Sequence, residues 1–145
     1  MQTEPFVLLT GASGFVGSHL AETLAQNNIR LRLTVPPQEA AALSGDIVPV
    51  MASGSDTDWR PALADVDVVV HLAARVHVMS ETSDDPLRDF RAVNTEATEQ
   101  LARQAVECGV KRMVFASTLH VNGNAATAEH PFSEEDTAQP PSPYA

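Results

Sequence analysis

Three closely spaced glycines follow a run of strand-forming residues and precede a helical pattern in the segment VLLTGASGFVGSHL. Gly11 permits a tight turn, Gly14 lets a phosphate group approach the backbone, and Gly17 lets the following helix pack closely on the sheet. The first N–H groups of that helix are free donors at its positive dipole end, where they favour an anion. The segment therefore predicts a dinucleotide-binding turn. A hydrolase nucleophile at Ser13 would require the pattern G-x-S-x-G, and Phe15 occupies the place of the second glycine.

Strand-like apolar runs alternate with helical segments along the whole chain of 145 residues. A continuous apolar run such as DVDVVVHLAA is typical of a strand that is covered on both faces of its sheet. Alternating strands and helices favour right-handed crossovers and a doubly wound, mainly parallel sheet. We therefore expect an α/β Rossmann-type domain over residues 1–145. Its expected strands are Phe6–Leu9, Leu31–Val35, Ile47–Met51, Val66–Leu72 and Met113–Ala116.

A long helix is predicted before the last of these strands. Asp84 or Asp85 is a candidate N-cap, Pro86 fits the first turn, and Gly109 provides a stop. Asn94 falls within the apolar face that residues at spacings of three and four produce. A buried amide needs hydrogen-bond partners, since it costs about 1–3 kcal/mol without them. Asn94 is therefore interpreted as a structural bracket between backbone segments, which can themselves belong to a site.

Charge and cysteine content limit the class of partner and the compartment. The formal net charge of −10 argues against a nucleic-acid or anionic-membrane surface, because both attract basic patches. The lone cysteine, Cys108, cannot form an internal disulfide, so we expect a reducing, cytoplasmic environment and a packing role for its side chain. The histidines show neither a helical H-x-x-x-H pair nor zinc-finger spacing, and no metal site is expected.

Several segments together resemble one family. The spacing T-G-A-S-G-F-V-G is similar to that of the extended short-chain dehydrogenases/reductases, which include the NAD-dependent epimerases and dehydratases of nucleotide-sugars related to UDP-glucose 4-epimerase. VVVHLAA resembles the fourth strand of that family, FRAVNTEAT its central helix, and VKRMVFASTLHVNG its fifth strand. The resemblance implies that an NAD or NADP cofactor is bound by Gly11, Ser13, Gly14, Phe15, Val16, Gly17, Leu72, Ala73, Ala74, Asn94 and Ser117.

The last six residues, PPSPYA, resemble the opening of the family's Y-x-x-x-K motif. The resemblance implies that Tyr144 is the catalytic tyrosine and that Thr118 is the hydroxyl residue of the catalytic set. The lysine of the motif would lie beyond Ala145, the last residue of this sequence. The chain then corresponds to the N-terminal portion of such an enzyme, without the last sheet strands and the C-terminal substrate region. We expect it to have little or no turnover alone.

The activity implied by the resemblance is hydride transfer at a sugar carbon of a UDP-sugar. The substrate would be a UDP-hexose or a UDP-N-acetylhexosamine, and epimerase, reductase and dehydratase remain open. The family also implies a homodimer formed through the long helix. The alternative is a non-catalytic dinucleotide-binding or redox-sensing module of the same fold. Thr118 and Tyr144 favour the enzyme, because a sensor does not need that pair.

The sequence leaves the choice between NAD and NADP open. The family usually carries an acidic residue for the adenosine ribose at the end of the second strand, about twenty residues beyond the glycines. Here the aligned position is Val35. Arg32 lies close by and could meet the 2′-phosphate of NADP, but strand alternation equally allows it to face solvent, and we interpret it as solvent-facing. On balance NAD is favoured.

Overall fold

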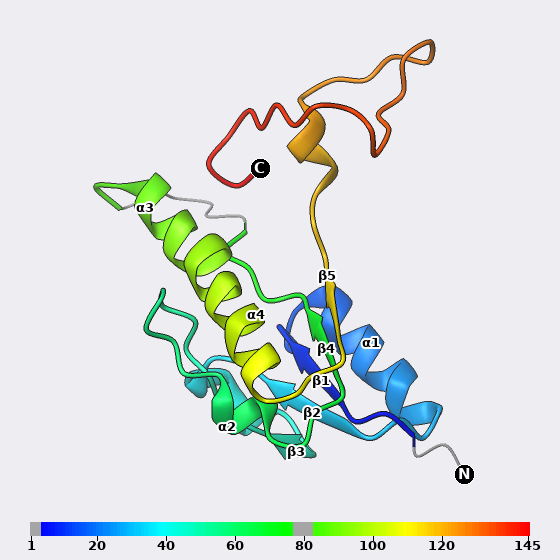
Figure 1. Cartoon of the computed structure of the whole chain (residues 1–145), viewed down its shortest axis with the longest axis vertical. Coiled ribbons are helices and arrows are strands. Elements are labelled where there is room, and N and C mark those ends of the chain that lie inside the picture. The colour runs from blue at the N-terminus through cyan, green and yellow to red at the C-terminus, as the bar shows by residue number, and fades with distance from the viewer. Residues whose placement is uncertain (1–3, 77–82) are drawn as a thin grey trace.

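Five parallel strands form one sheet in a computed structural model that describes residues 4–76 and 83–145. The sheet order is β3-β2-β1-β4-β5 (Figure 1), which confirms the expected doubly wound, Rossmann-type arrangement. The order reverses between β1 and β4, and such a switch point leaves a crevice at the carboxyl ends of the two strands. The strands are β1 Val7–Thr10, β2 Leu31–Thr34, β3 Asp46–Ile47, β4 Val68–His71 and β5 Arg112–Phe115.

Helices cover the two faces of this sheet. In Figure 1 α1 lies on one side of the strands, and α2 and α4 lie on the other. No helix within residues 4–76 and 83–145 is long and apolar enough to cross a membrane. The α-helices are α1 Phe15–Gln26, α2 Arg60–Leu63, α3 Pro86–Phe90 and α4 Ala97–Glu107, with a π-helix η2 at Arg91–Glu96 and 3-10 helices η1 at Pro37–Ala42 and η3 at Leu119–Asn122.

Alternate residues of the central strands enter two separate cores. Leu8 and Val69 pack with Trp59 and Leu101 on the α2 and α4 side. The neighbouring residue Leu9 packs on the α1 side, with Leu33, Val35 and the partly buried Leu20 among its partners. Both cores lie against β1, and β1 itself is buried at all four positions. Packing on both faces therefore fixes the carboxyl end of β1, from which the glycine-rich turn leaves the sheet.

The third strand is shorter than the sequence predicts. Strand pairing is assigned only to Asp46–Ile47, although Ile47–Met51 was expected. The backbone still follows β2 further, because the N–H of Val48 bonds the Leu33 carbonyl at 3.0 Å and that of Val50 bonds the Val35 carbonyl at 3.0 Å. Pro49 lies between them and has no N–H to donate, which limits the regular ladder.

The long helix begins and ends as predicted but is not uniform. The Asp85 side chain accepts the Arg88 N–H at 3.1 Å, Pro86 occupies the first turn, and Gly109 follows the helix with φ of +80°. Between α3 and α4 the helix widens into the π-turn η2, which contains Asn94. The expected packing role of Cys108 is wrong, because its side chain is exposed at the helix end.

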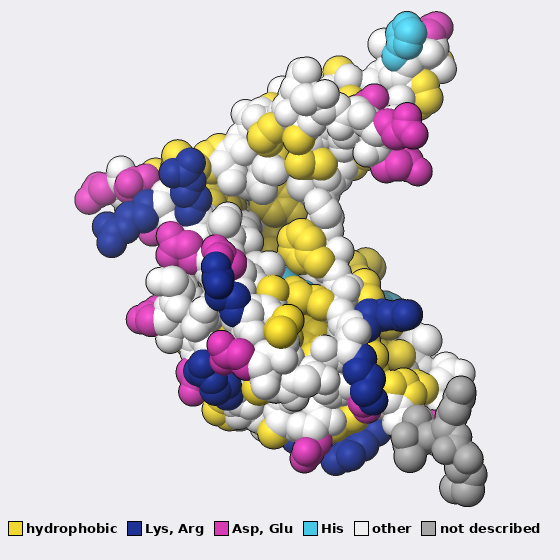
Figure 2. All heavy atoms as spheres, in the orientation of Figure 1, with side chains coloured by type: hydrophobic (Ala, Val, Ile, Leu, Met, Phe, Trp, Pro, Cys, Tyr) yellow, Lys and Arg dark blue, Asp and Glu magenta, His cyan; other side chains and the backbone are white. Residues whose placement is uncertain are grey.

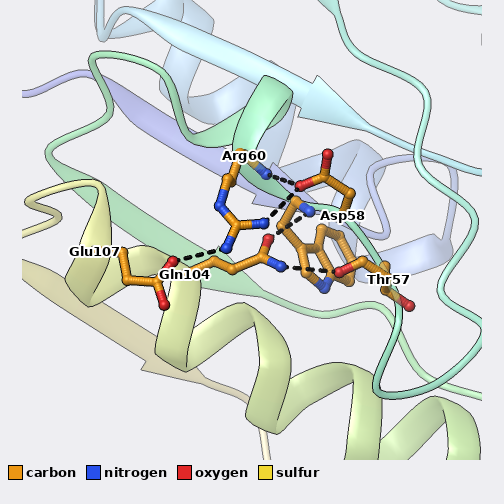
Figure 3. A network of polar contacts seen from close by, with 6 residues as sticks. Thr57, Asp58, Arg60, Gln104 and Glu107 are labelled. Carbon is orange, nitrogen blue, oxygen red and sulfur yellow. Dashed lines mark hydrogen bonds and ion pairs between the residues drawn. The ribbon is translucent and has the colours of Figure 1, made fainter.

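A buried glutamine joins α4 to the segment before α2. Gln104 is 1% exposed, its Oε1 accepts the Trp59 N–H at 2.6 Å, and its Nε2 donates to the Thr57 carbonyl at 3.1 Å (Figure 3). Next to these two hydrogen bonds, the exposed Arg60 and Glu107 form an ion pair at 2.9 Å. The amide therefore satisfies two backbone groups that the core would otherwise bury without partners.

We expect Gln104→Met to lower the free energy of unfolding by about 2–4 kcal/mol, because it leaves the Trp59 N–H and the Thr57 carbonyl unpaired in the core. Urea unfolding followed by tryptophan fluorescence measures the change. Glu107→Gln is the matched control on the same helix, and it should barely move the midpoint because exposed ion pairs contribute little. Equal effects from both variants would contradict the role given to Gln104.

Candidate functional site

The glycine-rich turn lies directly against the end of β4. Gly11 has φ of +68°, and a Cβ added there would stand 2.8 Å from the Ala73 nitrogen. A Cβ added at Gly17 would stand 2.1 Å from the Gly11 carbonyl oxygen, because α1 packs onto the turn. The Gly11 N–H also bonds the Thr34 carbonyl at 3.2 Å, which ties the turn to the end of β2. Only glycine fits these two positions.

The outer side of the turn is open and suits a phosphate-bearing group. A Cβ added at Gly14 would meet the Gly11 carbonyl oxygen at 3.3 Å and no other atom within 4 Å among the described residues. No side chain caps the first turn of α1, so its N–H groups remain available to an anion. Phe15 and Val16 are 83% and 62% exposed beside this surface. The predicted cofactor residues of this segment therefore surround a free backbone cradle.

A carboxylate lies beside this cradle. Ser13 is exposed on the turn, and its hydroxyl donates a hydrogen bond to Oε2 of Glu39. Glu39 belongs to η1, the 3-10 helix that follows β2. The contact brings the segments after β1 and β2 together, as expected for neighbouring parallel strands.

Beneath the turn, a chain of hydroxyl and imidazole groups links β1, β4 and α4, and its two members on the strands are buried. Thr10 and His71 end their strands at paired positions and are 0% and 2% exposed. The Thr10 Oγ1 lies 2.7 Å from His71 Nδ1, and His71 Nε2 lies 2.9 Å from the Thr98 hydroxyl. The same Thr10 oxygen accepts the N–H groups of Leu72 at 3.1 Å and Ala73 at 3.0 Å.

These contacts determine which nitrogen of His71 carries the proton. The two backbone N–H groups occupy both lone pairs of the Thr10 oxygen, so its hydrogen must go to His71 Nδ1. His71 is therefore neutral, with its hydrogen on Nε2, where it donates to Thr98. Burial disfavours the charged imidazolium and lowers the pKa of His71 to about 4.

A cavity of about 450 Å³ opens at the carboxyl ends of β4 and β5. Figure 2 shows this side of the molecule hollowed between the sheet and the C-terminal segment, with hydrophobic side chains in the hollow. Ala73, Ala74, Asn94, Ser117, Thr118 and Tyr144 line it together with residues of α3 and the C-terminal segment. The structure thus brings both predicted catalytic residues and four of the predicted cofactor residues to one space.

Thr118 and Tyr144 reach the cavity from different segments. Thr118 follows β5, and its Oγ1 accepts the His120 N–H at 3.3 Å at the start of η3. The C-terminal segment then turns back, with the Gln139 N–H bonded to the Val121 carbonyl at 2.8 Å. Tyr144 stands edge-on to Phe90 of α3, with ring centroids 6.4 Å apart. Thr118 and Tyr144 therefore line the same cavity, although 26 positions of sequence separate them.

Asn94 and Leu72 act on the loop after β4. Asn94 Oδ1 accepts the Arg75 N–H at 2.7 Å, and its Nδ2 donates to the Arg75 carbonyl at 2.9 Å. This amide therefore holds the backbone of the cavity's rim, as a structural bracket does. Leu72 is half-buried and its side chain packs against the core on the α1 side of the sheet, which anchors the start of the loop after β4.

Sequence reasoning missed Thr10, His71, Thr98 and Glu39. Thr10 and His71 end neighbouring parallel strands, which is why they meet. The signal in the sequence was a polar residue at the end of each of two apolar runs. The interpretation of Arg32 as solvent-facing is wrong. Its side chain is 14% exposed, and its guanidinium bonds Asp46 at 3.0 Å and the Ala62 and Ala64 carbonyls at 3.1 and 2.8 Å.

No metal site accompanies this cavity in the described part of the chain. Among residues 4–76 and 83–145, no three His, Cys, Asp or Glu side chains are grouped so that they could hold a metal ion.

Comparison with known proteins gives this geometry a context. Residues 7–145 match the model of the NAD dependent epimerase/dehydratase family. A UDP-glucose 4-epimerase of Vibrio cholerae is 37% identical over 138 residues, which are 95% of this chain and 42% of that protein.

Two solved structures are similar in fold. One is a short-chain dehydrogenase/reductase superfamily protein from Agrobacterium tumefaciens with bound NAD, with a TM-score of 0.78, 27% identity, and coverage of 96% of this chain and 40% of that one. The other is MoeE5 in complex with UDP-glucose and NAD, with a TM-score of 0.75, 31% identity, and coverage of 96% and 44%. The chain spans 40–44% of the length of these three relatives.

The threonine pair at the ends of β1 and β2 offers a test of the buried network. Thr10 and Thr34 are paired in register and equally buried, but Thr34 Oγ1 finds no partner among the described residues. We expect Thr10→Val to lower the free energy of unfolding by about 2–4 kcal/mol, whereas Thr34→Val should be neutral or raise it by up to about 1 kcal/mol. Urea unfolding of both variants measures this, and a loss of similar size in each would contradict the network.

The lowered pKa of His71 predicts a dependence of stability on pH. The unfolded chain takes up a proton near pH 6.5 and the folded chain only near pH 4, so the unfolded state binds more protons between these values. The contribution is complete above about pH 6.5 and decreases as the pH falls, by about 3 kcal/mol at pH 4. Urea unfolding between pH 7 and pH 4.5 should show a shallower decrease for His71→Gln than for the wild type. His19→Gln, at an exposed histidine of α1, is the control and should keep the wild-type slope.

Proposed function

The chain belongs to the NAD dependent epimerase/dehydratase family, and we propose that it supplies the cofactor-binding part of an enzyme that acts on a UDP-sugar. The reaction proposed is hydride transfer at a sugar carbon, as in an epimerase or a reductase, and the sugar is a hexose or an N-acetylhexosamine. The UDP-glucose 4-epimerase of Vibrio cholerae and the UDP-glucose complex of MoeE5 support a substrate of this class.

One observation carries this proposal. The cavity at the carboxyl ends of β4 and β5 gathers Thr118, Tyr144 and the loop after β4, and that loop lies against the glycine-rich turn. A dinucleotide that rests its phosphates on the turn would therefore extend toward the two hydroxyl side chains. A module that only binds the dinucleotide would have no need to place a tyrosine and a threonine there.

The residues of this chain would hold the cofactor at three places. The backbone at Gly14 and the first turn of α1 would receive the pyrophosphate. Ala73 and Ala74 would pass beneath the dinucleotide where it crosses from β1 to β4, and Ser117 would lie at its far end. When bound, NAD would supply the acceptor and donor of the hydride.

Thr118 and Tyr144 would act on the substrate's hydroxyl group. The Thr118 hydroxyl would hydrogen-bond the reacting oxygen and hold it in place, while the Tyr144 phenol oxygen would take its proton. A lysine ammonium beside the tyrosine favours the ionised phenol. The lysine of the family's Y-x-x-x-K motif would lie beyond Ala145, so we expect little turnover when residues 1–145 are studied alone. Phe90 fixes one edge of the Tyr144 ring and so restricts the position of the phenol.

Two further expectations belong to this proposal and stay predictions. The first is a homodimer formed through the helix that contains α3 and α4. The second is a cytoplasmic location, which rests on the lone exposed Cys108.

The proposal is tested with the complete protein that contains this chain, assayed with NAD on UDP-glucose and UDP-N-acetylglucosamine. We expect Tyr144→Phe and Thr118→Val each to lower kcat by about 100-fold or more, because a positioned acid–base group contributes that much. Binding of NAD, measured by isothermal titration calorimetry, should change little, since neither side chain belongs to the phosphate cradle.

Thr127→Val replaces an exposed threonine of the C-terminal segment and should retain wild-type turnover. Wild-type turnover in Tyr144→Phe would contradict the catalytic assignment. Absence of turnover on every UDP-sugar despite tight NAD binding would leave the dinucleotide-binding module as the better description.

A further inference from the structure

One wall of the cavity is a helical face that is rich in hydrogen-bond donors. It is formed by η2 and the start of α4, and the residues that it contributes, at spacings of three and four, are Arg91, Asn94, Thr95 and Thr98. The Asn94 amide is already bound to the backbone of Arg75. The other three residues are called the donor wall below.

In the part of the chain that the structure describes, Arg91 is the one charged side chain that lines the cavity. It is exposed, and it makes no hydrogen bond or ion pair with another described residue. Two carboxylates of the same helix are engaged by other arginines: Asp89 lies 3.9 Å from Arg75, and Glu99 lies 2.6 Å from Arg103. The guanidinium of Arg91 is therefore available to a ligand, and its planar fork of N–H groups matches a carboxylate.

The buried network determines how the Thr98 hydroxyl is oriented. His71 donates its Nε2 hydrogen to Thr98 Oγ1 at 2.9 Å, so Thr98 accepts on that side and has its own hydrogen to donate elsewhere. No residue within 4–76 and 83–145 accepts this hydrogen, and Thr98 lines the cavity. Thr95 is exposed on the same wall, and its hydroxyl likewise has no partner among the described residues. The donor wall therefore offers one cationic and two neutral donors.

The part of a nucleotide-sugar that enters this cavity is the sugar, because Thr118 and Tyr144, which would act on its hydroxyl group, line the same space. No acidic side chain of the described residues lines it, so none there repels an anion or competes for Arg91. From Arg91 to Thr98 the helix rises by about 10 Å, which is the scale of a sugar ring with its substituents. A sugar can therefore lie along the donor wall with one end at the guanidinium.

We propose that the donor wall selects a sugar that carries a carboxylate, so that the substrate is the UDP derivative of a uronic acid. Arg91 binds the carboxylate at C6, and the hydroxyl groups of Thr95 and Thr98 donate to oxygen atoms further along the ring. A neutral hexose places a hydroxymethyl group at C6 and gives the guanidinium no anionic partner. This inference rests on the proposed function and narrows the sugar that it names.

The test is the affinity of the complete protein, loaded with NAD, for UDP-glucuronic acid and for UDP-glucose, measured by isothermal titration calorimetry. These two probes differ only at C6. The wild type should bind the uronate at least about tenfold more tightly, and Arg91→Met should remove that preference while changing the affinity for UDP-glucose by less than about twofold. Because both probes are measured on each variant, a loss of folded protein cannot produce this change of ratio.

Thr95→Val should weaken the binding of both probes by about threefold to tenfold, because it removes a neutral donor from an exposed position without a structural partner. The control for charge is Arg88→Met, which makes the same substitution three residues before Arg91, at an exposed arginine that does not line the cavity. This control should keep the wild-type ratio.

Three results would overturn the inference while the proposed function stands. They are equal affinity of the wild type for both probes, an equal loss of both in Arg91→Met, which would place the guanidinium on the shared diphosphate, and an equal change of ratio in Arg88→Met. Failure of the NAD-loaded wild type to bind either UDP-sugar would overturn the proposed function and this inference with it.

Discussion

The hydroxyl group of Thr10 joins the parts of the molecule that have to meet at the switch point. It accepts the N–H groups of the first two residues after β4 and donates to the imidazole of His71, which in turn reaches Thr98 on α4. One oxygen atom therefore sets how β4 leaves the sheet, where the glycine-rich turn packs and how α4 is anchored. The cavity forms above this point, because its rim is the loop that Thr10 and Asn94 hold from two sides.

The fold followed from patterns that are local in sequence. Glycine spacing, the alternation of apolar runs with helices, and the caps around the long helix each depend on neighbouring residues, and the structure has the expected parallel sheet. The network of Thr10 and His71 could not be predicted in this way. Its members are 61 positions apart, and they meet only because β1 and β4 pair in one particular register. Arg32 illustrates the same limit, since Asp46 and the carbonyls that bind it come from later segments.

The candidate site was predictable to the extent that its residues lie at strand ends. Ser117 and Thr118 follow β5, and Ala73 and Ala74 follow β4, so parallel strands bring them to one edge. Tyr144 reaches the same cavity through a different cause, because the segment after η3 folds back and places its ring against Phe90. The π-turn that contains Asn94 is also a tertiary effect: a widened turn points the amide at the Arg75 backbone, and no helix propensity encodes it.

The chain has a net charge of −10, and the geometry of the glycine-rich turn shows how such a chain can still receive an anionic dinucleotide. The attraction does not come from basic side chains, since the 16 residues from Gly11 to Gln26 include no lysine or arginine. It comes from backbone N–H groups at an uncapped helix end, whose partial charges act over a short range. A site built in this way is compatible with a nearby carboxylate, so Glu39, which is bonded to the Ser13 hydroxyl, need not prevent the approach of a pyrophosphate to the turn.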